Sequence, residues 1–287
     1  MTDPRGDEQP LPGGDVTDGV VRVGNTVHRP VGPHSDLVHR ALEHLEATGF
    51  DGAPRFLGTD DQGREVLSFI DGEVAGRPWP TWVADPARGT SVARLLRRLD
   101  DALLELGLPE HTAVRSWPSG APEPVGPTAS FLGHRDVTPE NTVFRGGLAV
   151  ALIDFDLLRP SSRVDEVANL LLWWAGWTAP QDRNPAFAGV DPGARGRLLV
   201  AAYGLSDEDV EWVVSVSISA AQQSWHTMLH RAEELGGGWA RMWDEGVGEQ
   251  IRRREEWLVS EQRSLRGALR EYSVNISGEP SDADGES

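Results

Sequence analysis

Cysteine and lysine are both absent from this sequence of 287 residues. Without cysteine there is no disulfide framework, no zinc–thiolate site and no cysteine nucleophile. Residues 1–12 are polar and acidic, so they do not form the basic and apolar segments of a signal peptide. No apolar run reaches the roughly 20 residues that a membrane span needs. These absences predict a cytoplasmic protein with no membrane partner.

The charge of the chain is strongly one-sided. It has 27 basic residues, all of them arginine, against 45 acidic residues, which gives a formal net charge of −18. Binding to a phosphate backbone requires clustered cationic side chains, so nucleic acid is not expected as a partner. A cationic ligand would be favoured, although an acidic surface can equally serve solubility.

Short strands and one helix are expected in the first quarter of the chain. The Gly24–Asn25 pair reads as a tight turn between two strands, and Ser35 is a plausible helix N-cap. Apolar residues at helical and at alternating spacing complete the pattern. The expected elements are strands at 20–23 and 26–29, a helix at 35–48, and strands at 50–57 and 65–69.

Helices are expected to dominate the rest of the chain. Residues 72–89 contain three prolines and read as a connector. Both ends of the chain, 1–18 and 274–287, are rich in Gly, Pro, Ser and acidic residues and are expected to be disordered tails. The fold class predicted is therefore α+β, with the following helical segments: 91–106, 165–177, 194–203, 207–234 and 240–272.

The chemistry is concentrated between residues 134 and 154. Asp136 is followed five residues later by Asn141, and a predicted hairpin then ends on Asp154. Phosphoryl transfer needs a carboxylate near the acceptor hydroxyl and hard oxygen ligands for magnesium on the phosphates. Asp136 suits the first requirement, and Asn141 and Asp154 suit the second. Each residue alone is more often structural, as a turn former or a surface charge, but the spacing of the set favours a catalytic site.

This stretch resembles the catalytic core of the aminoglycoside phosphotransferase family, kinases of small molecules with a protein-kinase-like fold. The pattern His-x-Asp-x-x-x-x-Asn is present from His134, and the following strand ends Ile-Asp at Asp154. A counterpart of the family's next helix opens at Asp165. The resemblance implies that Asp136 is catalytic and that Asn141 and Asp154 bind Mg²⁺. It also implies that His134 and Asp165 support the loop without touching substrate.

The resemblance further implies a bilobal arrangement and a nucleotide cofactor, ATP or GTP. The small lobe with an antiparallel sheet would span residues 19–71, and the larger, mainly helical lobe, 72–273, would hold the catalytic loop and the acceptor. Adenine would lie against the segment that contains Ser68, Phe69 and Ile70.

The nucleotide side departs from the kinase pattern. Arg29 stands where a strand lysine is usual, and its guanidinium fork suits phosphate oxygens. The helix glutamate expected as its partner would fall near Val38 or His39, neither of which is acidic. Arg29 would then pair with Glu43, one turn away, or with no acid of the expected kind. A glycine-rich phosphate loop is not evident either.

The acceptor is expected between the catalytic loop and residues 173–257, where tryptophans and acidic clusters occur. Such walls suit a cationic or glycosylated metabolite, although helical tryptophan is usually core. The favoured function is a Mg–ATP-dependent phosphotransferase that acts on a hydroxyl of a small molecule, an aminoglycoside or another metabolite. Two alternatives stay open: a nucleotide-binding pseudokinase or partner-binding module without transfer activity, and a kinase of a natural-product peptide. The sequence does not specify an oligomeric state.

Overall fold

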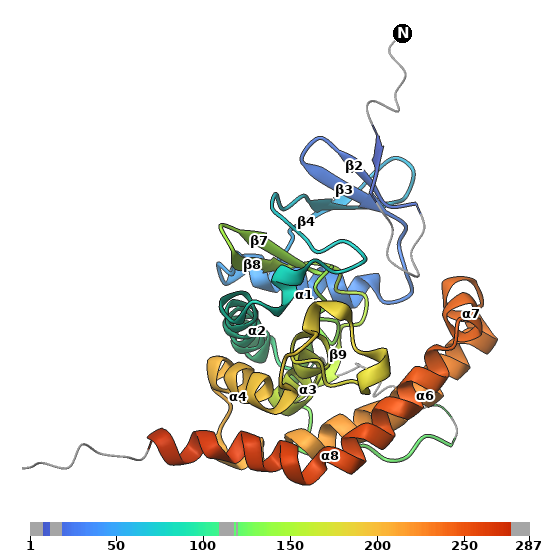
Figure 1. Ribbon diagram of the computed structural model, residues 1–287. Coiled ribbons are helices and arrows are strands. Elements are labelled where there is room, and N and C mark those ends of the chain that lie inside the picture. The colour runs from blue at the N-terminus through green and yellow to red at the C-terminus, as the bar shows by residue number, and fades with distance from the viewer. Residues whose placement is uncertain (1–7, 12–18, 109–117, 119, 277–287) are drawn as a thin grey trace, which may run out of the picture.

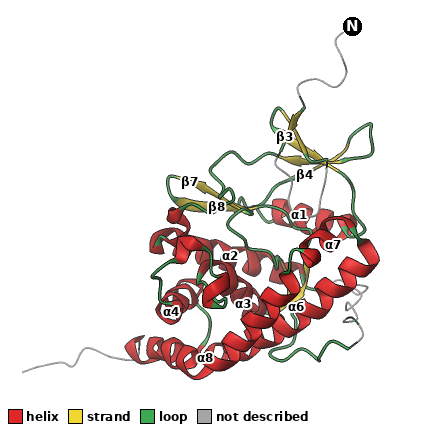
Figure 2. Ribbon diagram, turned by 45° about the vertical axis from the view of Figure 1, so that its right-hand side comes forward, coloured by secondary structure: helices red, strands yellow, loops and turns green. Residues whose placement is uncertain are grey.

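A small antiparallel sheet lies at one end of the molecule and a larger helical part at the other (Figure 1). The computed structural model describes residues 8–11, 19–108, 118 and 120–276. The larger part is mainly helical but also contains strands, among them β7 (Thr142–Arg145) and β8 (Leu148–Leu152), as the colouring by secondary structure shows (Figure 2).

The small sheet has the strand order β1-β2-β3-β5-β4, and each neighbouring pair is antiparallel. Helix α1 contacts β4 of this sheet and also α2 (Pro86–Leu106) of the larger part, and its apolar residues at helical spacing, among them Val38, Leu42 and Leu45, are buried. The element order expected from the sequence is confirmed here. The bounds are β1 Gln9–Pro10, β2 Val21–Val23, β3 Thr26–Arg29, α1 Ser35–Ala47, β4 Phe56–Thr59 and β5 Glu65–Ser68.

The two ends of the chain differ in part from the disordered tails expected from the sequence. Gln9 and Pro10 form β1, which pairs with β2, and Glu8 makes an ion pair with Arg64 at 2.9 Å. These contacts add residues 8–11 to the sheet, although the sequence placed them in a tail. At the other end α8 continues to Ile276, so it extends past residue 274. Residues 1–7, 12–18 and 277–287 lie outside the described part.

The helical part begins with α2, which starts earlier than the expected residue 91. The Asp85 carboxylate accepts a hydrogen bond from the Ala87 N–H at 2.8 Å, and Pro86 occupies the first helical position, where its missing N–H costs nothing. Long helices α6 and α8 lie side by side, with α7 at their far end (Figure 1). The bounds are η1 Thr81–Ala84, α2 Pro86–Leu106, α3 Arg163–Trp174, η2 Pro180–Asp182, η3 Pro185–Phe187, α4 Pro192–Tyr203, α5 Asp207–Val210, α6 Val213–Leu235, α7 Gly237–Asp244 and α8 Val247–Ile276.

Two strand pairs of the larger part fix the loop that carries the motif. Strand β6, Phe131–Gly133, pairs with β9, Arg159–Ser161, and β7, Thr142–Arg145, pairs with β8, Leu148–Leu152. Residues 134–141 therefore begin at one strand pair and end at the other. A backbone bridge between Glu73 and Phe144 ties the inter-lobe connector to β7.

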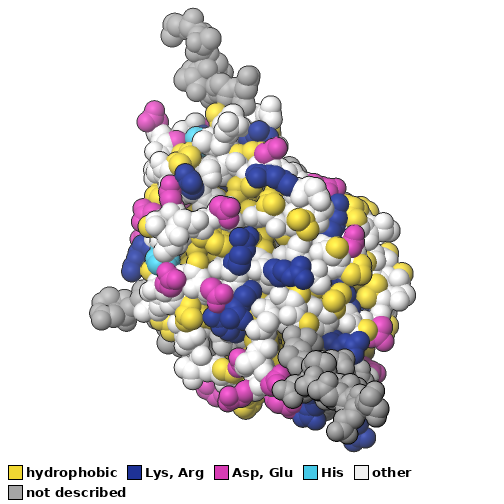
Figure 3. Space-filling model, turned by 90° about the vertical axis from the view of Figure 1, so that its left-hand side faces the viewer, with side chains coloured by type: hydrophobic (Ala, Val, Ile, Leu, Met, Phe, Trp, Pro, Cys, Tyr) yellow, Lys and Arg dark blue, Asp and Glu magenta, His cyan; other side chains and the backbone are white. Residues whose placement is uncertain are grey.

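Positive and negative side chains are mixed on at least one face of the molecule (Figure 3). One face shows arginine and acidic side chains interspersed with apolar patches, despite the net negative charge of the chain (Figure 3). Within the described residues, no helix combines the length and the apolar character needed to cross a membrane.

Candidate active site

The loop after β6 folds Asn141 back onto Asp136. The side-chain amide of Asn141 donates to the Asp136 backbone oxygen at 3.1 Å and to Asp136 Oδ2 at 2.8 Å. The Ile153 N–H donates to the Asn141 backbone oxygen at 2.9 Å. The motif residues on the loop and the end of β8 are therefore brought together. Because Asn141 spends its N–H group on Asp136, its side-chain oxygen is the atom left for a metal.

His134 is a fully buried neutral brace of this loop. Its Nε2 lies 3.0 Å from the Ile153 backbone oxygen, and the Asp136 N–H lies 3.3 Å from its Nδ1. These two contacts require a proton on Nε2 and a lone pair on Nδ1. Burial lowers the pKa of His134 to about 4, so the ring is uncharged near neutral pH. The structure places His134 in contact with both sides of the site.

In this loop, Asp136 is the acidic residue whose pKa departs most from its ordinary value. Burial raises its pKa to about 7, with further contributions from the negative charges of Asp154 and Glu140. The hydrogen bond from Asn141 opposes the shift but does not cancel it. A carboxyl group with a pKa near neutrality is well matched to accepting a proton from a hydroxyl.

Backbone strain is located at the same place. Arg135 and Asp154 are the two non-glycine residues with positive φ in the described part of the chain, at 61° and 63°. This left-handed region is unfavourable for residues with a Cβ, and it persists where surrounding contacts enforce it. Asp154 follows β8 by two residues, and 37% of its side chain is exposed.

Helix α3 fixes the loop from below. The Val137 N–H donates to Asn169 Oδ1 at 2.9 Å, and Trp174 Nε1 donates to the Val137 oxygen at 2.8 Å. Asp165 forms a capping box with Ser162. The contacts of Asn169 and Trp174 with this loop were not predicted from the sequence. The signal was present in Asn169, a polar residue that interrupts an apolar helix.

Two acids of α3 also contact Arg135. Nη1 of Arg135 lies 3.1 Å from Asp165 Oδ1, and its backbone N–H donates to Glu166 Oε2 at 3.3 Å. Glu166 is fully buried, and burial raises its pKa although the charge of Arg135 opposes this. A Cβ at Gly133 would lie 2.1 Å from Glu166 Oε1, so only glycine fits there. The contact between Asp165 and the loop is observed; its role in catalysis stays a prediction.

Arg29 reaches from β3 into the same site. Its Nη1 lies 3.2 Å from Asp154 Oδ1, its Nη2 contacts Asp156, and its Nε lies 2.9 Å from Glu65 Oε1. Burial alone would lower the pKa of Arg29, but Asp156 and Asp154 outweigh it and raise the pKa above its ordinary value. The predicted partner Glu43 is wrong: it is exposed on α1, whereas Glu65 on β5 faces Arg29 directly.

The predicted adenine segment is partly occupied by contacts within the small lobe. The Ser68 N–H donates to the Arg55 oxygen at 2.9 Å, and the Phe69 N–H donates to the Asn25 oxygen at 2.8 Å. Ile70 follows β5 at the start of the inter-lobe connector. Ser68 and Phe69 therefore already use these donors in the sheet, and the adenine role of the segment stays a prediction.

The predicted metal ligands form a donor set that fits magnesium. Asn141 and Asp154 supply hard oxygen atoms, and Asp156 adds a carboxylate that is 41% exposed. Burial is the main cause of the raised pKa of Asp136; the negative charges of Asp154 and Glu140 add to it, and a divalent cation would offset that second contribution. Among the described residues, however, no group of three or more acidic, His or Cys side chains can hold a metal. A magnesium ion here would need phosphate oxygens as additional ligands, which is its usual mode at phosphoryl-transfer sites.

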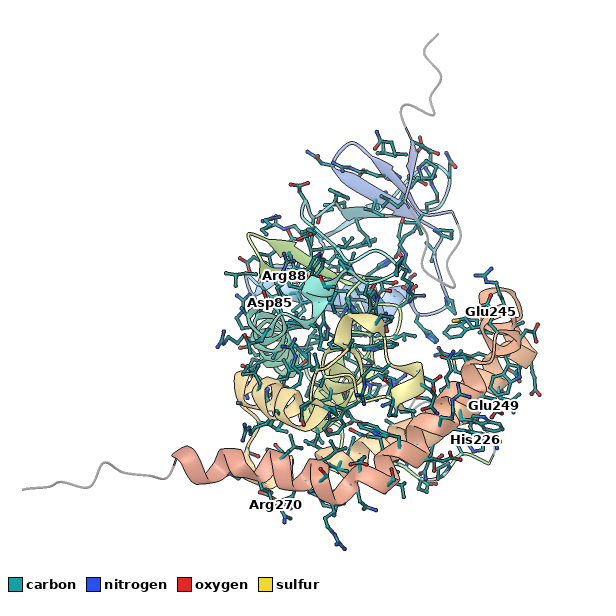
Figure 4. All side chains as sticks on the ribbon, viewed as in Figure 1. Asp85, Arg88, His226, Glu245, Glu249 and Arg270 are labelled. Atoms are coloured by element: carbon teal, nitrogen blue, oxygen red, sulfur yellow. The ribbon has the colours of Figure 1, made fainter. Side chains whose placement is uncertain are left out.

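The tryptophans of the predicted acceptor region separate into two groups. Trp174 and Trp177 are core residues. Trp225 lies instead beside His226 and Arg252 in an open cleft of about 630 Å³ between α6 and α8. Figure 4 shows His226, Glu245 and Glu249 on this helical arm, away from Asp85 and Arg88 below the small lobe.

Comparisons of the structure show which fold this is. An ethanolamine kinase from Plasmodium vivax matches with a TM-score of 0.56 and 14% identity, over 88% of this chain and 81% of the other. A macrolide 2′-phosphotransferase from Brachybacterium faecium matches with a TM-score of 0.50 and 12% identity, over 87% and 90%. The α+β bilobal, protein-kinase-like fold of small-molecule phosphotransferases that the resemblance predicted is confirmed.

Comparison of the sequence gives a nearer relative. No protein-family model matches the chain. The trifolitoxin immunity protein of Rhizobium leguminosarum bv. trifolii is 34% identical over 279 residues, which covers 92% of this chain and 99% of the relative. With that identity over nearly the full length of both chains, this protein belongs to the family of the trifolitoxin immunity protein.

Proposed function

We propose that this protein is a phosphotransferase that transfers the terminal phosphoryl group of ATP or GTP to a hydroxyl of a toxin. This transfer would protect the cell that makes the phosphotransferase. The observation that carries the proposal is the convergence of Asp136, Asn141 and Asp154: Asn141 is hydrogen-bonded to Asp136, and the negative charge of Asp154 acts on the same Asp136 carboxyl group. The immunity function named for the relative and the kinase-like fold support a small-molecule acceptor that is harmful until modified. A cytoplasmic location fits this proposal and stays a prediction.

Asp136 would act on the acceptor. With a pKa raised to about 7, its carboxylate is suited to take the hydroxyl proton as the acceptor oxygen bonds to the γ-phosphorus. The bond from the γ-phosphorus to the bridging oxygen breaks in the same step, and the nucleoside diphosphate leaves with that electron pair. Asn141 orients Asp136 through its 2.8 Å hydrogen bond.

Asn141 and Asp154 would hold Mg²⁺, with Arg29 beside them to bind phosphate oxygens. When bound, the metal neutralises the phosphate charge that develops during transfer. Arg29 already faces the Asp154 carboxylate, so its guanidinium lies where phosphates held at Asp154 would be in reach.

A second function is favoured by one specific observation. All three nitrogens of the Arg29 guanidinium face carboxylates, namely Glu65, Asp154 and Asp156. A protein locked in this arrangement would protect by binding the toxin without phosphorylating it.

The test is to incubate the protein with γ-labelled ATP, Mg²⁺ and extracts that contain candidate toxins, and to detect labelled products by mass spectrometry. The Asp136→Asn variant should lose at least ~100-fold in transfer while it still binds Mg–ATP, because general-base contributions are of this size. Protection of cells by wild type and Asp136→Asn alike, with no labelled product, would replace transfer by binding.

A further inference from the structure

Arg29 is anchored by a short buried chain of side chains in the small lobe. Glu65 is only 3% exposed, and its two oxygens are divided between two partners. Oε1 lies 2.9 Å from Arg29 Nε, and Oε2 lies 2.5 Å from His39 Nε2. The His39 ring stacks on Phe56 with centroids 3.7 Å apart. The chain of contacts thus joins α1, β5 and β3.

The register of the sheet sets this geometry. Arg29 and Glu65 are direct Cα partners in the antiparallel ladder of β3 and β5, so their side chains project from the same face. His28, the residue before Arg29 on β3, projects to the opposite face, and its Nδ1 lies 2.8 Å from Asp60 Oδ2. The position of Glu65 is therefore fixed by strand pairing and does not depend on the orientation of α1.

Burial of Glu65 and Arg29 costs free energy, so we ask what these charged side chains do beyond stabilising the fold. Taking a carboxylate and a guanidinium out of water is costly unless their charges and hydrogen bonds are matched. A hydrophobic pair of similar volume would serve the fold at least as well. The polar pair instead orients a guanidinium toward the carboxylates of the candidate metal site.

We propose that Glu65 and His39 are positioning residues that hold Arg29 for the nucleotide phosphates. The inference rests on the proposed function, since it assigns a task within the same site. Glu65 does from a strand what a helix glutamate does for the strand lysine of protein kinases, and His39, on α1, holds the second oxygen of Glu65. Glu65 forms an ion pair at Arg29 Nε without hydrogen-bond geometry. The two terminal nitrogens contact Asp154 and Asp156.

Removal of Glu65 would change where Arg29 points. Without an anchor on Nε, the guanidinium is drawn onto Asp154 and Asp156 alone, which it already contacts. That rearrangement would neutralise the metal-binding carboxylate and withdraw the fork from the phosphates. Both effects weaken binding of the Mg–nucleotide complex.

The experiment measures Mg–ATP affinity by calorimetry, and KM and kcat separately, for Glu65→Gln, Arg29→Ala and the double variant. Glu65→Gln should weaken Mg–ATP affinity and raise the KM for ATP by at least ~10-fold with a smaller change in kcat. In the Arg29→Ala background the same substitution should have almost no further effect, because the coupling passes through Arg29. Glu43→Gln, an exposed glutamate on α1, is the matched control and should behave as wild type.

Equal losses from Glu65→Gln with and without Arg29, or no loss at all, would overturn the assignment. His39→Asn, with a smaller loss in the same direction, provides the second test where Glu65→Gln does not fold. Wild type that binds Mg–ATP but transfers no phosphate removes the proposed function and leaves the positioning role measurable by affinity. Wild type that binds no nucleotide removes both.

Discussion

The loop of residues 134–141 and Arg29 of the small lobe reach the same candidate site by different means. Residues 134–141 are fixed by hydrogen bonds to α3 and β8, which follow closely in the chain. Arg29 is fixed by ion pairs to Glu65, Asp154 and Asp156, which lie far away in the sequence. One half of the site follows a compact local pattern, and the other depends on how distant elements meet.

The two halves of the site should therefore differ in how well they tolerate substitutions. In the loop, the neutral histidine, the Asn141 amide and several backbone groups are hydrogen-bonded to one another. When one of these groups is lost, its buried hydrogen-bond partner is left unsatisfied. An arginine held by several carboxylates can lose one partner and redistribute its bonds to the others. Substitution of a proposed metal ligand or of the histidine within the catalytic half should therefore have a larger effect than substitution of Arg29.

The largest effect is expected for Asp154→Asn, the residue at which both halves meet. Loss of this carboxylate removes a proposed metal ligand and should reduce transfer ~1,000-fold or more, because metal ions supply several kcal/mol of charge stabilisation. Transfer measured across a magnesium titration checks this. Full activity at ordinary magnesium concentration would remove Asp154 from the metal site.

Acid stability tests the catalytic half through His134. Its pKa is about 4 in the folded protein, below the usual 6.5, so the unfolded chain binds more protons between these values. Stability from the neutral ring is complete above pH 6.5 and falls as the pH drops to 4, by about 3 kcal/mol in total.

Chemical unfolding of wild type and His134→Gln from pH 8 to pH 4 measures this contribution. The wild-type advantage should shrink by about 3 kcal/mol as the pH falls. Curves that stay parallel over the whole range would show that His134 does not change protonation on unfolding.

Arg29→Ala is expected to have a smaller effect than Asp154→Asn. Loss of a charged phosphate contact is worth about 1.5–3 kcal/mol, or roughly 10- to 100-fold in kcat/KM for ATP. Steady-state kinetics with varied ATP provide the measurement. A loss as large as that of Asp154→Asn would mean that the two halves are equally sensitive.

The smallest effect is expected for Trp174→Phe, a change below the loop. It removes the donor to the Val137 oxygen and leaves that buried acceptor unpaired, at about 1–3 kcal/mol of folding free energy. Thermal unfolding measures the loss, and kcat should change less than for any substitution above. A variant with unchanged stability would show that water replaces the indole.

Local patterns predicted much of this structure. The strands around Gly24 and Asn25, the helix over residues 35–47 and the hairpin before Asp154 follow from spacing and turn chemistry, and the fold is confirmed. The roles assigned to Asp136, Asn141 and Asp154 stay predictions, although the structure brings these residues together.

Contacts between distant elements were beyond such patterns. Glu65 was overlooked because its alignment with Arg29 depends on strand register, which no single segment specifies. Strand β1 was assigned to a tail because a short, polar stretch gains its stability only from pairing with β2. Asn169 was not identified because its bond to Val137 depends on tertiary packing.

The guanidinium of Arg29 also determines how this cleft will respond to chemical labelling. Reagents that locate nucleotide sites by acylating a lysine amine need an uncharged nitrogen nucleophile. Arginine stays protonated at any ordinary pH, and here its pKa is raised further by Asp156 and Asp154. Since the chain contains no lysine, such reagents would find no lysine amine to acylate at this site.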